Sequence, residues 1–546
     1  MDIIVIGGGA AGMKAAARAR RRDGEANITV VEAGKFVSLG RCGLPYYIGG
    51  IVHEIDDLRR TTYGAVRDEE YFKAVKDIEV LTETRAVAID REKRVVRISR
   101  KGSEDELNYD YLVVATGAKP IKPNVKGVDN ERVTGLYSAE EAEKIVEFWE
   151  EGAEKAVVVG AGFIGLEACE ALRNLEIDVT LVEAMPHVAP AMLDAEMARL
   201  VERHLVEKGV EVVTAARVEE IRGEDELVVV AGGREIPADF VVLAVGVKPN
   251  VELAEKAGLR IGELGGIVVD ERMRTSDERI YAGGDCVETK NVLTGEKVVA
   301  PFGDVANKQG RVIGDNVTGG NSIFPGVIGT AIFKVFDLSV ATTGLREDVA
   351  KRYFDADSVL LSVPDRSHYY PGMSNMRIKL VYDRKTRRVL GAQIVGSGGV
   401  DKRIDVIATA IARSATIDDL ANLDLAYAPP YSPAIDAVIT AANVAQNKLE
   451  GLLRSVRAEE ARKLVEEGRA VILDVRSEEE RNRNPLDVQS IHIPLHELRK
   501  RLNELPRDKI VLTICPLGLR AYEASRILIA AGFDARSVEG GLAFWG

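Results

Sequence analysis

The sequence predicts an α/β protein of several domains, two of which have the Rossmann-like arrangement of strand, glycine loop and helix. Its 546 residues exceed what a single hydrophobic core supports. Two glycine-rich loops, at residues 7–12 and 160–165, each follow a short apolar run and precede a helix-forming run. Because such loops let the backbone approach a pyrophosphate, the duplicated pattern indicates two dinucleotide sites.

Composition narrows the class of protein. The formal net charge of −13 argues against a general affinity for nucleic acid or for an anionic membrane. The four cysteines, at positions 42, 169, 286 and 515, form no CxxC pair and no metal-ligand spacing. We expect a cytoplasmic protein in a reducing compartment, with no membrane span and no metal.

The first loop lies in a complete binding pattern. Residues 3–6 form a short apolar strand, the glycine loop follows, and residues 28–31 form a second strand that ends in Glu32, 20 residues beyond Gly12. A carboxylate at this place accepts hydrogen bonds from ribose hydroxyls. A glycine-rich turn without a ligand is the alternative.

The second loop repeats this logic. Glu183 ends the strand at residues 179–182, 18 residues past Gly165, and residues 241–250 end the unit. A 2′-phosphate near Glu183 would meet a like charge, which favours NADH over NADPH unless a nearby basic residue offsets it. The expected NAD(P)H contacts are Gly160, Gly162, Phe163, Ile164, Gly165, Glu183 and Gly246.

Two later segments carry a resemblance. Residues 111–118 and 275–285 resemble the paired ATG and GD motifs of flavoprotein disulfide reductases with two dinucleotide sites. The resemblance implies FAD in the first site, Asp285 on the ribityl chain, and a helix under the flavin that begins in residues 306–311. The implied FAD contacts are Gly7, Gly9, Ala10, Ala11, Gly12, Glu32, Ala115, Thr116, Gly117, Asp285 and Ala306.

Cys42 is the candidate redox residue. The larger disulfide reductases have a CxxxxC pair, but this chain has Val37 where the second cysteine would stand. Cys42 therefore has to react with an outside sulfur as a mixed disulfide or persulfide, or cycle through a sulfenic acid. Pro45 marks a helix start, whose amides we expect to lower the thiol pKa. We interpret Cys169 and Cys286 as packing residues.

The segment at residues 38–48 resembles the single-cysteine branch of this family, in particular coenzyme A disulfide reductases, with Ser38 four residues before Cys42. A basic helix face follows the first loop and suits the phosphates of coenzyme A. A solvated helix face is the alternative interpretation. The candidate coenzyme A contacts are Lys14, Arg18, Arg21, Arg22, Ser38 and Arg60.

The third region resembles the dimerisation domain of the family. It has strand patterns at residues 377–382 and 389–396 and a helical run at residues 403–413. Two tyrosine-containing segments, at residues 368–372 and 426–431, resemble segments that approach the cysteine of the other subunit. The resemblance implies a homodimer in which Tyr369 and Tyr427 donate hydrogen bonds to the sulfur. Packing at the interface is the alternative for these tyrosines.

The C-terminal region resembles a rhodanese domain. Cys515 follows the strand at residues 509–514, and Arg520 lies in the loop that leads into a helix. Loop amides there suit a thiolate or a persulfide anion, so Cys515 is the expected sulfur carrier. The segment at residues 485–493 departs from the rhodanese pattern, which weakens the case for thiosulfate sulfurtransferase activity. A degenerate domain kept for dimer stability is the alternative.

Together these features predict an enzyme that uses FAD, NADH or NADPH, and coenzyme A to reduce polysulfide, persulfide or coenzyme A persulfide to hydrogen sulfide. Coenzyme A disulfide reduction, NADH oxidase or peroxidase activity, and a sulfur-trafficking or redox-sensing role are the alternatives. The predicted domains are an FAD-binding domain at 1–150 and 263–325, an NAD(P)H-binding domain at 151–262, a dimerisation domain at 326–446, a linker at 447–454 and a rhodanese-like domain at 455–546.

Overall fold

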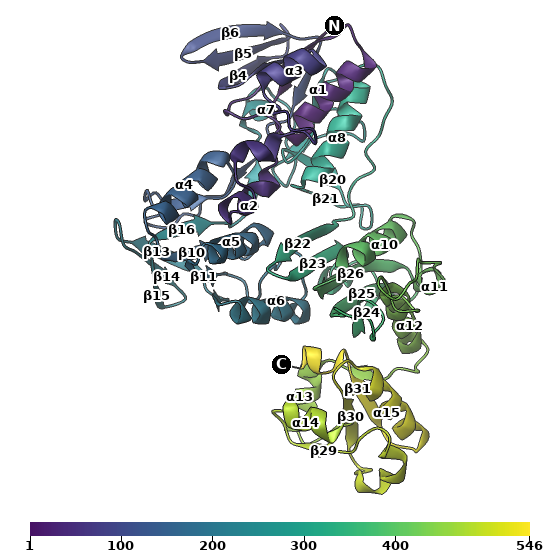
Figure 1. The fold of residues 1–546 in the computed structure, drawn as a ribbon. Coiled ribbons are helices and arrows are strands. Elements are labelled where there is room, and N and C mark those ends of the chain that lie inside the picture. Colours follow the sequence, from purple (N-terminus) through teal and green to yellow (C-terminus); the bar gives the residue numbers. More distant parts are fainter. Residues whose placement is uncertain (546) are drawn as a thin grey trace. The chain divides into compact units, whose positions relative to one another are not determined.

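The computed structural model describes residues 1–545, which form two compact units. Unit 1 comprises residues 1–188 and 205–327, and unit 2 comprises residues 189–204 and the chain from residue 328 onward. Gly546, the last residue of the predicted rhodanese-like domain, lies outside the described residues. Both units contain strands and helices (Figure 1).

The first sheet of unit 1 has the strand that precedes the first glycine loop at its centre. Its order is β19-β7-β1-β2-β3, and every pair is parallel. The strands are β1 (Asp2–Ile6), β2 (Asn27–Val31), β3 (Glu79–Leu81), β7 (Tyr111–Val114) and β19 (Ile280–Ala282). Parallel strands end at the same edge, so the glycine loop, Glu32 and Ala115 meet there.

The second sheet repeats this arrangement. Its order is β12-β11-β10-β16-β9, again with parallel pairs. The strands are β10 (Lys155–Val159), β11 (Asp178–Val182), β12 (Val210–Val213), β16 (Phe240–Leu243) and β9 (Val133–Gly135). Antiparallel three-stranded sheets precede β7 and β16 at equivalent places, namely β4 (Thr84–Asp90), β5 (Val95–Arg100) and β6 (Ser103–Asn108), and β13 (Val218–Arg222), β14 (Leu227–Ala231) and β15 (Arg234–Ala238).

The strand β9 lies before the predicted domain boundary at residue 150 but belongs to the second sheet. It pairs with β16 in the second sheet, with Val241 opposite Val133. The helix α4 (Ala139–Glu150) follows it and packs Phe148 on Phe240, with ring centroids 5.2 Å apart. The domain boundaries stay a prediction, and this pairing favours a first boundary before Val133.

Two helices of unit 1 pack closely against each other. They are α1 (Ala10–Arg22) and α8 (Gly303–Asn316), which lie side by side (Figure 1). A Cβ atom added at Gly310 would lie 2.3 Å from the Ala11 carbonyl oxygen, and one at Gly314 would lie 2.5 Å from the Ala15 carbonyl oxygen. Glycine at these places therefore allows the two helix backbones to approach.

Unit 2 contains one antiparallel and one parallel sheet. The antiparallel sheet has the order β22-β23-β26-β25-β24, and the parallel sheet has the order β27-β31-β30-β28-β29. The first comprises β22 (Ala331–Val335), β23 (Leu338–Gly344), β24 (Ala356–Pro364), β25 (Asn375–Asp383) and β26 (Val389–Gly396), followed by α10 (Val400–Ala412), α11 (Ile417–Ala421) and α12 (Ala437–Leu449). The second comprises β27 (Ser455–Val456), β28 (Ala470–Asp474), β29 (Ser490–His492), β30 (Ile510–Ile514) and β31 (Ala535–Val538), with α13 (Ala458–Glu466), α14 (Glu478–Arg483) and α15 (Leu519–Ala530).

The predicted fold class is confirmed, and both strands expected in the third region are present as β25 and β26. The helix expected at residues 403–413 begins earlier, at Val400. Gly399 precedes it with a positive φ of 64°, a conformation that glycine adopts without strain. The glycine-rich turn is therefore the point where the chain leaves β26 and enters α10.

Replacing Gly314 by alanine tests the α1–α8 contact. Because the new Cβ would meet the Ala15 carbonyl oxygen at 2.5 Å, we expect the free energy of unfolding to fall by about 1–3 kcal/mol. The matched control is Gly303→Ala on the same helix, where no atom lies within 4 Å of an added Cβ. Thermal unfolding measures both variants, and equal midpoints would contradict the close contact.

Candidate functional site

The first glycine loop forms a tight cradle. Gly7 has a φ of +110°, and a Cβ there would lie 2.1 Å from the Ala115 carbonyl oxygen. A Cβ at Gly12 would lie 1.9 Å from the Gly7 carbonyl oxygen, whereas one at Gly9 has no atom within 4 Å. The helix α1 begins here without a side-chain cap, so the open space at Gly9 and the first-turn amides fit a pyrophosphate.

Glu32 braces this cradle from the end of β2. Its carboxylate accepts hydrogen bonds from the Gly8 amide at 2.6 Å and from the Gly34 amide at 2.7 Å. The side chain is half-buried, and its remaining lone pairs are available to ribose hydroxyls. Glu32 therefore fixes the loop and also suits the dinucleotide.

The second loop has the same construction. The Glu183 carboxylate accepts from the Ala161 amide at 2.7 Å and from the Met185 amide at 2.8 Å. A Cβ at Gly165 would lie 1.9 Å from the Gly160 carbonyl oxygen, and one at Gly162 has no atom within 4 Å. The helix α5 (Phe163–Asn174) starts after Gly162 without a side-chain cap. This cradle also fits a pyrophosphate.

Asp285 follows β19 and is available to a ligand. Gln309 of α8 fixes the adjoining turn, because its side-chain oxygen accepts from the Gly284 amide at 2.7 Å. Burial raises the pKa of the Asp285 carboxyl, and the Arg41 guanidinium opposes that rise. Within residues 1–545 the Asp285 carboxylate has no hydrogen-bond partner, which fits a role in binding a ligand hydroxyl.

The segment that leads to Cys42 is hydrogen-bonded to the first glycine loop. The Ser38 amide donates to the Gly8 carbonyl oxygen at 2.8 Å, and Val37 is buried beside that loop. Cys42 then lies in the 3-10 turn η1 (Arg41–Gly43), directly before α2 (Leu44–Ile48). Its side chain is exposed, whereas the other three cysteines are buried, in agreement with packing roles for Cys169 and Cys286.

The expectation that helix amides lower the Cys42 pKa is wrong for the protein without cofactors. Although solvent reaches the side chain, the surrounding protein removes enough water to raise the thiol pKa. The carboxylates of Glu167 and Asp285 raise it further, and the backbone amide of Cys42 offsets only part of the rise. The helix α2 has only five residues, so its N-terminus contributes little.

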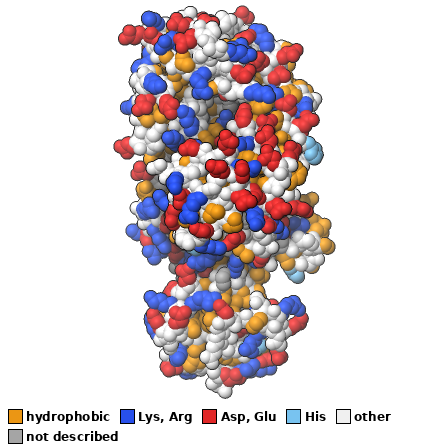
Figure 2. All heavy atoms as spheres, turned by 90° about the vertical axis from the view of Figure 1, so that its left-hand side faces the viewer, with side chains coloured by type: hydrophobic (Ala, Val, Ile, Leu, Met, Phe, Trp, Pro, Cys, Tyr) orange, Lys and Arg blue, Asp and Glu red, His pale blue; other side chains and the backbone are white. Residues whose placement is uncertain are grey.

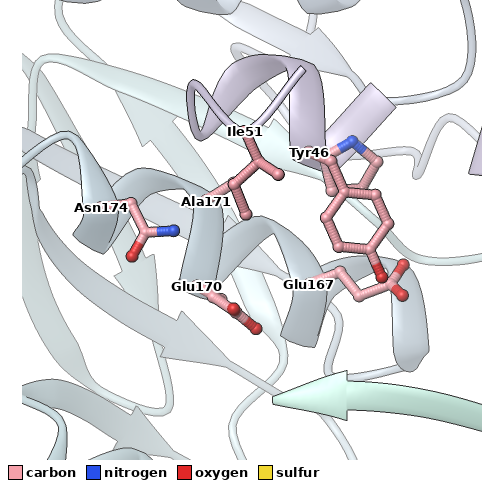
Figure 3. A pocket seen from close by; sticks show the side chains of 7 residues that line it. Tyr46, Ile51, Glu167, Glu170, Ala171 and Asn174 are labelled. Atoms are coloured by element: carbon pink, nitrogen blue, oxygen red, sulfur yellow. The ribbon is translucent and has the colours of Figure 1, made fainter. Parts of the chain in front are cut away.

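Glu167 is a site residue that sequence reasoning missed. It lies on α5 and lines a small pocket together with Pro45, Tyr46, Ile51, Glu170, Ala171 and Asn174. In Figure 3 the Tyr46 and Glu167 side chains point toward each other across this pocket. Burial, and then repulsion from Glu170, raise the pKa of Glu167 to about 7. The sequence feature that could have indicated Glu167 is an acidic residue directly after the apolar first turn of α5.

The candidate coenzyme A residues divide into two groups. The Arg18 guanidinium pairs with the Asp315 carboxylate of α8 at 2.5 Å, and Arg22 approaches the same carboxylate at 3.8 Å. These two arginines therefore support the α1–α8 contact. Lys14 and Arg21 form no ion pair or hydrogen bond with the described residues and are free for an anion.

The two remaining candidates lie near Cys42 in sequence and already have partners. Arg60 pairs with Asp57 at 2.9 Å and with Glu54 at 3.2 Å. The Ser38 hydroxyl accepts a hydrogen bond from Arg67 at 3.2 Å. Contacts of either residue with coenzyme A stay a prediction.

Two loops of unit 2 hold the predicted tyrosines at the surface. Tyr369 is 65% exposed and Tyr427 is 52% exposed. Arg403 of α10, itself 1% exposed, joins the loops by donating to the Asp365 carbonyl oxygen at 2.9 Å and to the Tyr431 carbonyl oxygen at 3.2 Å. Sequence reasoning missed Arg403, and the approach of the tyrosines to another subunit stays a prediction.

Cys515 lies at the end of β30 in a loop that leads into α15. Its buried Sγ accepts hydrogen bonds from the Gly518 amide at 3.1 Å and from the Ala521 amide at 3.3 Å. Arg520 forms a two-point ion pair with Glu480, at 2.8 and 2.7 Å. The loop amides therefore hold the sulfur, as the sequence pattern predicts for a carrier.

Several classes of site have no counterpart in the part of the chain that the structure describes. Residues 1–545 contain no cluster of His, Cys, Asp or Glu that could hold a metal ion. None of their helices is long and apolar enough to cross a membrane. On the face drawn in Figure 2, acidic and basic side chains are interspersed.

Replacing Glu167 by glutamine tests its effect on Cys42. Removing this carboxylate removes one cause of the raised thiol pKa. The pH profile for alkylation of Cys42 by iodoacetamide should therefore shift to lower pH, and the rate at pH 7 should be several-fold faster. Peptide mass spectrometry across pH values measures the rate at Cys42. Glu170→Gln is the control with the opposite expectation: it removes repulsion that raises the Glu167 pKa, so Glu167 stays charged and alkylation of Cys42 should not become faster. An unchanged profile in Glu167→Gln would contradict the coupling.

Comparison with known proteins agrees with this geometry. Residues 1–310 match the model of the pyridine nucleotide-disulphide oxidoreductase family, residues 330–439 match its dimerisation domain, and residues 457–546 match the rhodanese-like domain. A solved structure described as a NAD-dependent persulfide reductase from A. fulgidus is 62% identical, covers 100% of both chains and has a TM-score of 0.96.

Two curated relatives are similar over most of the chain. The NAD(P)H sulfur oxidoreductase (CoA-dependent) of Pyrococcus furiosus is 38% identical over 455 residues, which is 81% of this chain and 98% of that protein. A protein named NADH oxidase from Methanocaldococcus jannaschii is 37% identical over 459 residues, or 82% of this chain and 99% of that protein.

The family implies FAD and NAD(P)H as cofactors, and the dimerisation domain indicates a homodimer. The two duplicated cradles fit the two dinucleotides. The chain is therefore an oxidoreductase that belongs to the pyridine nucleotide-disulphide oxidoreductase family and carries a C-terminal rhodanese-like domain.

Proposed function

We propose that this enzyme uses NADH or NADPH to reduce polysulfide, persulfide or coenzyme A persulfide to hydrogen sulfide through Cys42. The observation that carries the proposal is that Cys42 is exposed next to the flavin cradle, while the other three cysteines are buried. With no second cysteine to pair with, its sulfur reacts with an external one. The names of the persulfide reductase and sulfur oxidoreductase relatives support this class of substrate.

The chemistry at Cys42 follows from thiol–disulfide exchange. The Cys42 thiolate attacks the inner sulfur of a persulfide R–S–S–H, so that a Cys42–S–S–R bond forms, the S–SH bond breaks and HS⁻ leaves. FAD, when bound, supplies the two-electron chemistry that returns Cys42 and the external thiol to their reduced forms. Glu32 and Asp285 would hold FAD, and Glu183 would hold the NADH ribose.

Coenzyme A is the proposed external thiol. Lys14 and Arg21 form no ion pair or hydrogen bond with residues 1–545, and the pyrophosphate and 3′-phosphate of coenzyme A need such cations. Ser38 and Arg60 are the further candidate contacts near Cys42. The CoA-dependent relative supports this assignment.

Tyr369 and Tyr427 are the proposed hydrogen-bond donors to the sulfur of a partner subunit. Both are exposed, which suits a role outside their own subunit. Arg403 would act as a positioning residue, because it fixes the backbone of both loops.

A second candidate function is NADH oxidase or peroxidase activity through a Cys42 sulfenic acid. The name of the Methanocaldococcus jannaschii relative favours it. The presence of a second sulfur site at Cys515, with its thiol held by two amides, favours sulfur-chain reduction instead. Coenzyme A disulfide reduction would use the same Cys42 chemistry.

Cys42→Ser tests the function by stopped-flow spectroscopy. Reduction of the flavin by NADH should stay within about twofold of the native rate, because the hydride step does not need the thiol. Reoxidation by persulfide or polysulfide should slow by about a hundredfold or more, because the nucleophile is lost. Full reoxidation by persulfide in this variant would overturn the proposal.

The matched control is Cys515→Ser, which should keep the native rate with coenzyme A disulfide. Parallel reactions with coenzyme A disulfide, hydrogen peroxide and oxygen rank the candidate functions. If oxygen or peroxide reoxidises the native protein fastest, the oxidase or peroxidase assignment replaces the sulfur one.

A further inference from the structure

The sulfur of Cys515 accepts hydrogen bonds from backbone amides, and the Arg520 guanidinium acts on it only through an electrostatic interaction without a hydrogen bond. Between Cys515 and Arg520 the loop reads Pro516, Leu517, Gly518 and Leu519, with no charged side chain. The Gly518 and Ala521 amides donate to Sγ at 3.1 and 3.3 Å. These two amides can hold the single negative charge of a thiolate or persulfide.

Two arginines of this domain, Arg520 and Arg476, each form an ion pair with a carboxylate. Arg520 donates to both oxygens of the Glu480 carboxylate, and this pairing lowers the pKa of Glu480 to about 2. Arg476 pairs with the Asp474 carboxylate at 2.7 Å, with both side chains almost fully buried. Each positive charge near Cys515 therefore has a permanent negative partner.

Glu539, another charged residue near the loop, also has partners of opposite charge. Glu539, which follows β31, pairs with Arg457 at 3.0 Å and with Lys448 at 3.0 Å. The residue after it, Gly540, lies against Gly518 of the loop. Lys448 and Arg457, the cations that pair with Glu539, therefore both have a carboxylate partner.

The tip of the loop is apolar. Leu519 is 67% exposed, although it lies only four residues beyond Cys515, and Pro516 and Leu517 are half-buried beside it. A substrate that reaches Cys515 therefore meets hydrocarbon and amide groups first. Bringing a dianion into such a place costs free energy that Arg520, which already pairs with Glu480, offsets only in part.

We propose that Cys515 takes sulfane sulfur from persulfides carried on an uncharged thiol arm and discriminates against thiosulfate. The inference rests on the proposed function only in taking Cys515 as the sulfur carrier. It adds the class of donor, which the loop selects through its lack of free positive charge and its apolar tip.

The transfer balances without an added oxidant or reductant. The Cys515 thiolate attacks the outer sulfur of R–S–S–H. A new S–S bond forms between Cys515 and that sulfur, and the S–S bond of the donor breaks. The electron pair of the broken bond leaves with R–S⁻, which takes a proton from water. The Gly518 and Ala521 amides keep the acceptor sulfur in place throughout.

The test measures sulfur loading of Cys515 in flavin-loaded protein with Cys42→Ser, so that only the carrier accumulates sulfur. The probes are sodium thiosulfate and N-acetylcysteamine persulfide, and the readout is the rate of mass gain by one sulfur atom on the Cys515 peptide. We expect loading by the persulfide to be at least about tenfold faster. Equal rates would overturn the proposal.

Glu480→Gln is a variant that should increase the loading of Cys515 by thiosulfate. Glutamine can still accept the Ser477 amide that now donates to Glu480 at 2.9 Å, so α14 keeps its cap while Arg520 loses its anionic partner. Thiosulfate loading should rise about tenfold, with a smaller change for the persulfide, which has an uncharged carrier and bears at most one negative charge.

Leu519→Arg is a second variant, because an exposed position tolerates substitution and the new cation lies at the loop tip. It should also raise thiosulfate loading. If neither variant changes the ratio of the two rates, the charge argument is wrong. If neither probe loads Cys515 while persulfide turnover at Cys42 is intact, the carrier role fails and the Cys42 function stands.

Discussion

Close backbone contact within the first glycine loop is the constraint on which the rest of the site depends. Gly7 lies against the Ala115 carbonyl oxygen, and Gly12 lies against the Gly7 carbonyl oxygen, so neither position has room for a side chain. Gly8 joins the loop to Glu32 through its amide and to Ser38 through its carbonyl. One loop therefore fixes the dinucleotide cradle and the start of the Cys42 segment together.

The two cysteines that we propose as reactive have opposite surroundings. Solvent reaches Cys42, but the surrounding protein removes part of its hydration, and this desolvation together with nearby carboxylates raises the pKa of the thiol. Cys515 is buried, and two amides hold its sulfur. These settings suit different tasks, since an exposed thiol without an internal partner can exchange with outside sulfur, whereas an amide-held sulfur can be carried. The rhodanese-like domain thus adds a second candidate sulfur site of a different kind.

The sequence predicted those features that depend on local patterns. Gly12 and Gly165, with Glu32 and Glu183 about twenty residues beyond them, predicted both cradles, because spacing along the chain sets the βαβ geometry. Long-range partners were not predictable: Asp315 pairs with Arg18 across 297 residues, and Glu480 pairs with Arg520 across 40. Neither partner has a motif of its own, so only packing revealed that part of the basic helix face is structural.

The central claim is that the sulfur partner of Cys42 comes from outside the chain. Mass spectrometry of the Cys42 peptide under non-reducing conditions, after the flavin-loaded protein meets coenzyme A persulfide without NADH, tests it most directly. The account predicts a mass increase at Cys42 from coenzyme A or added sulfur, which NADH then removes. An unmodified Cys42, or a disulfide between Cys42 and another cysteine of the chain, would contradict it.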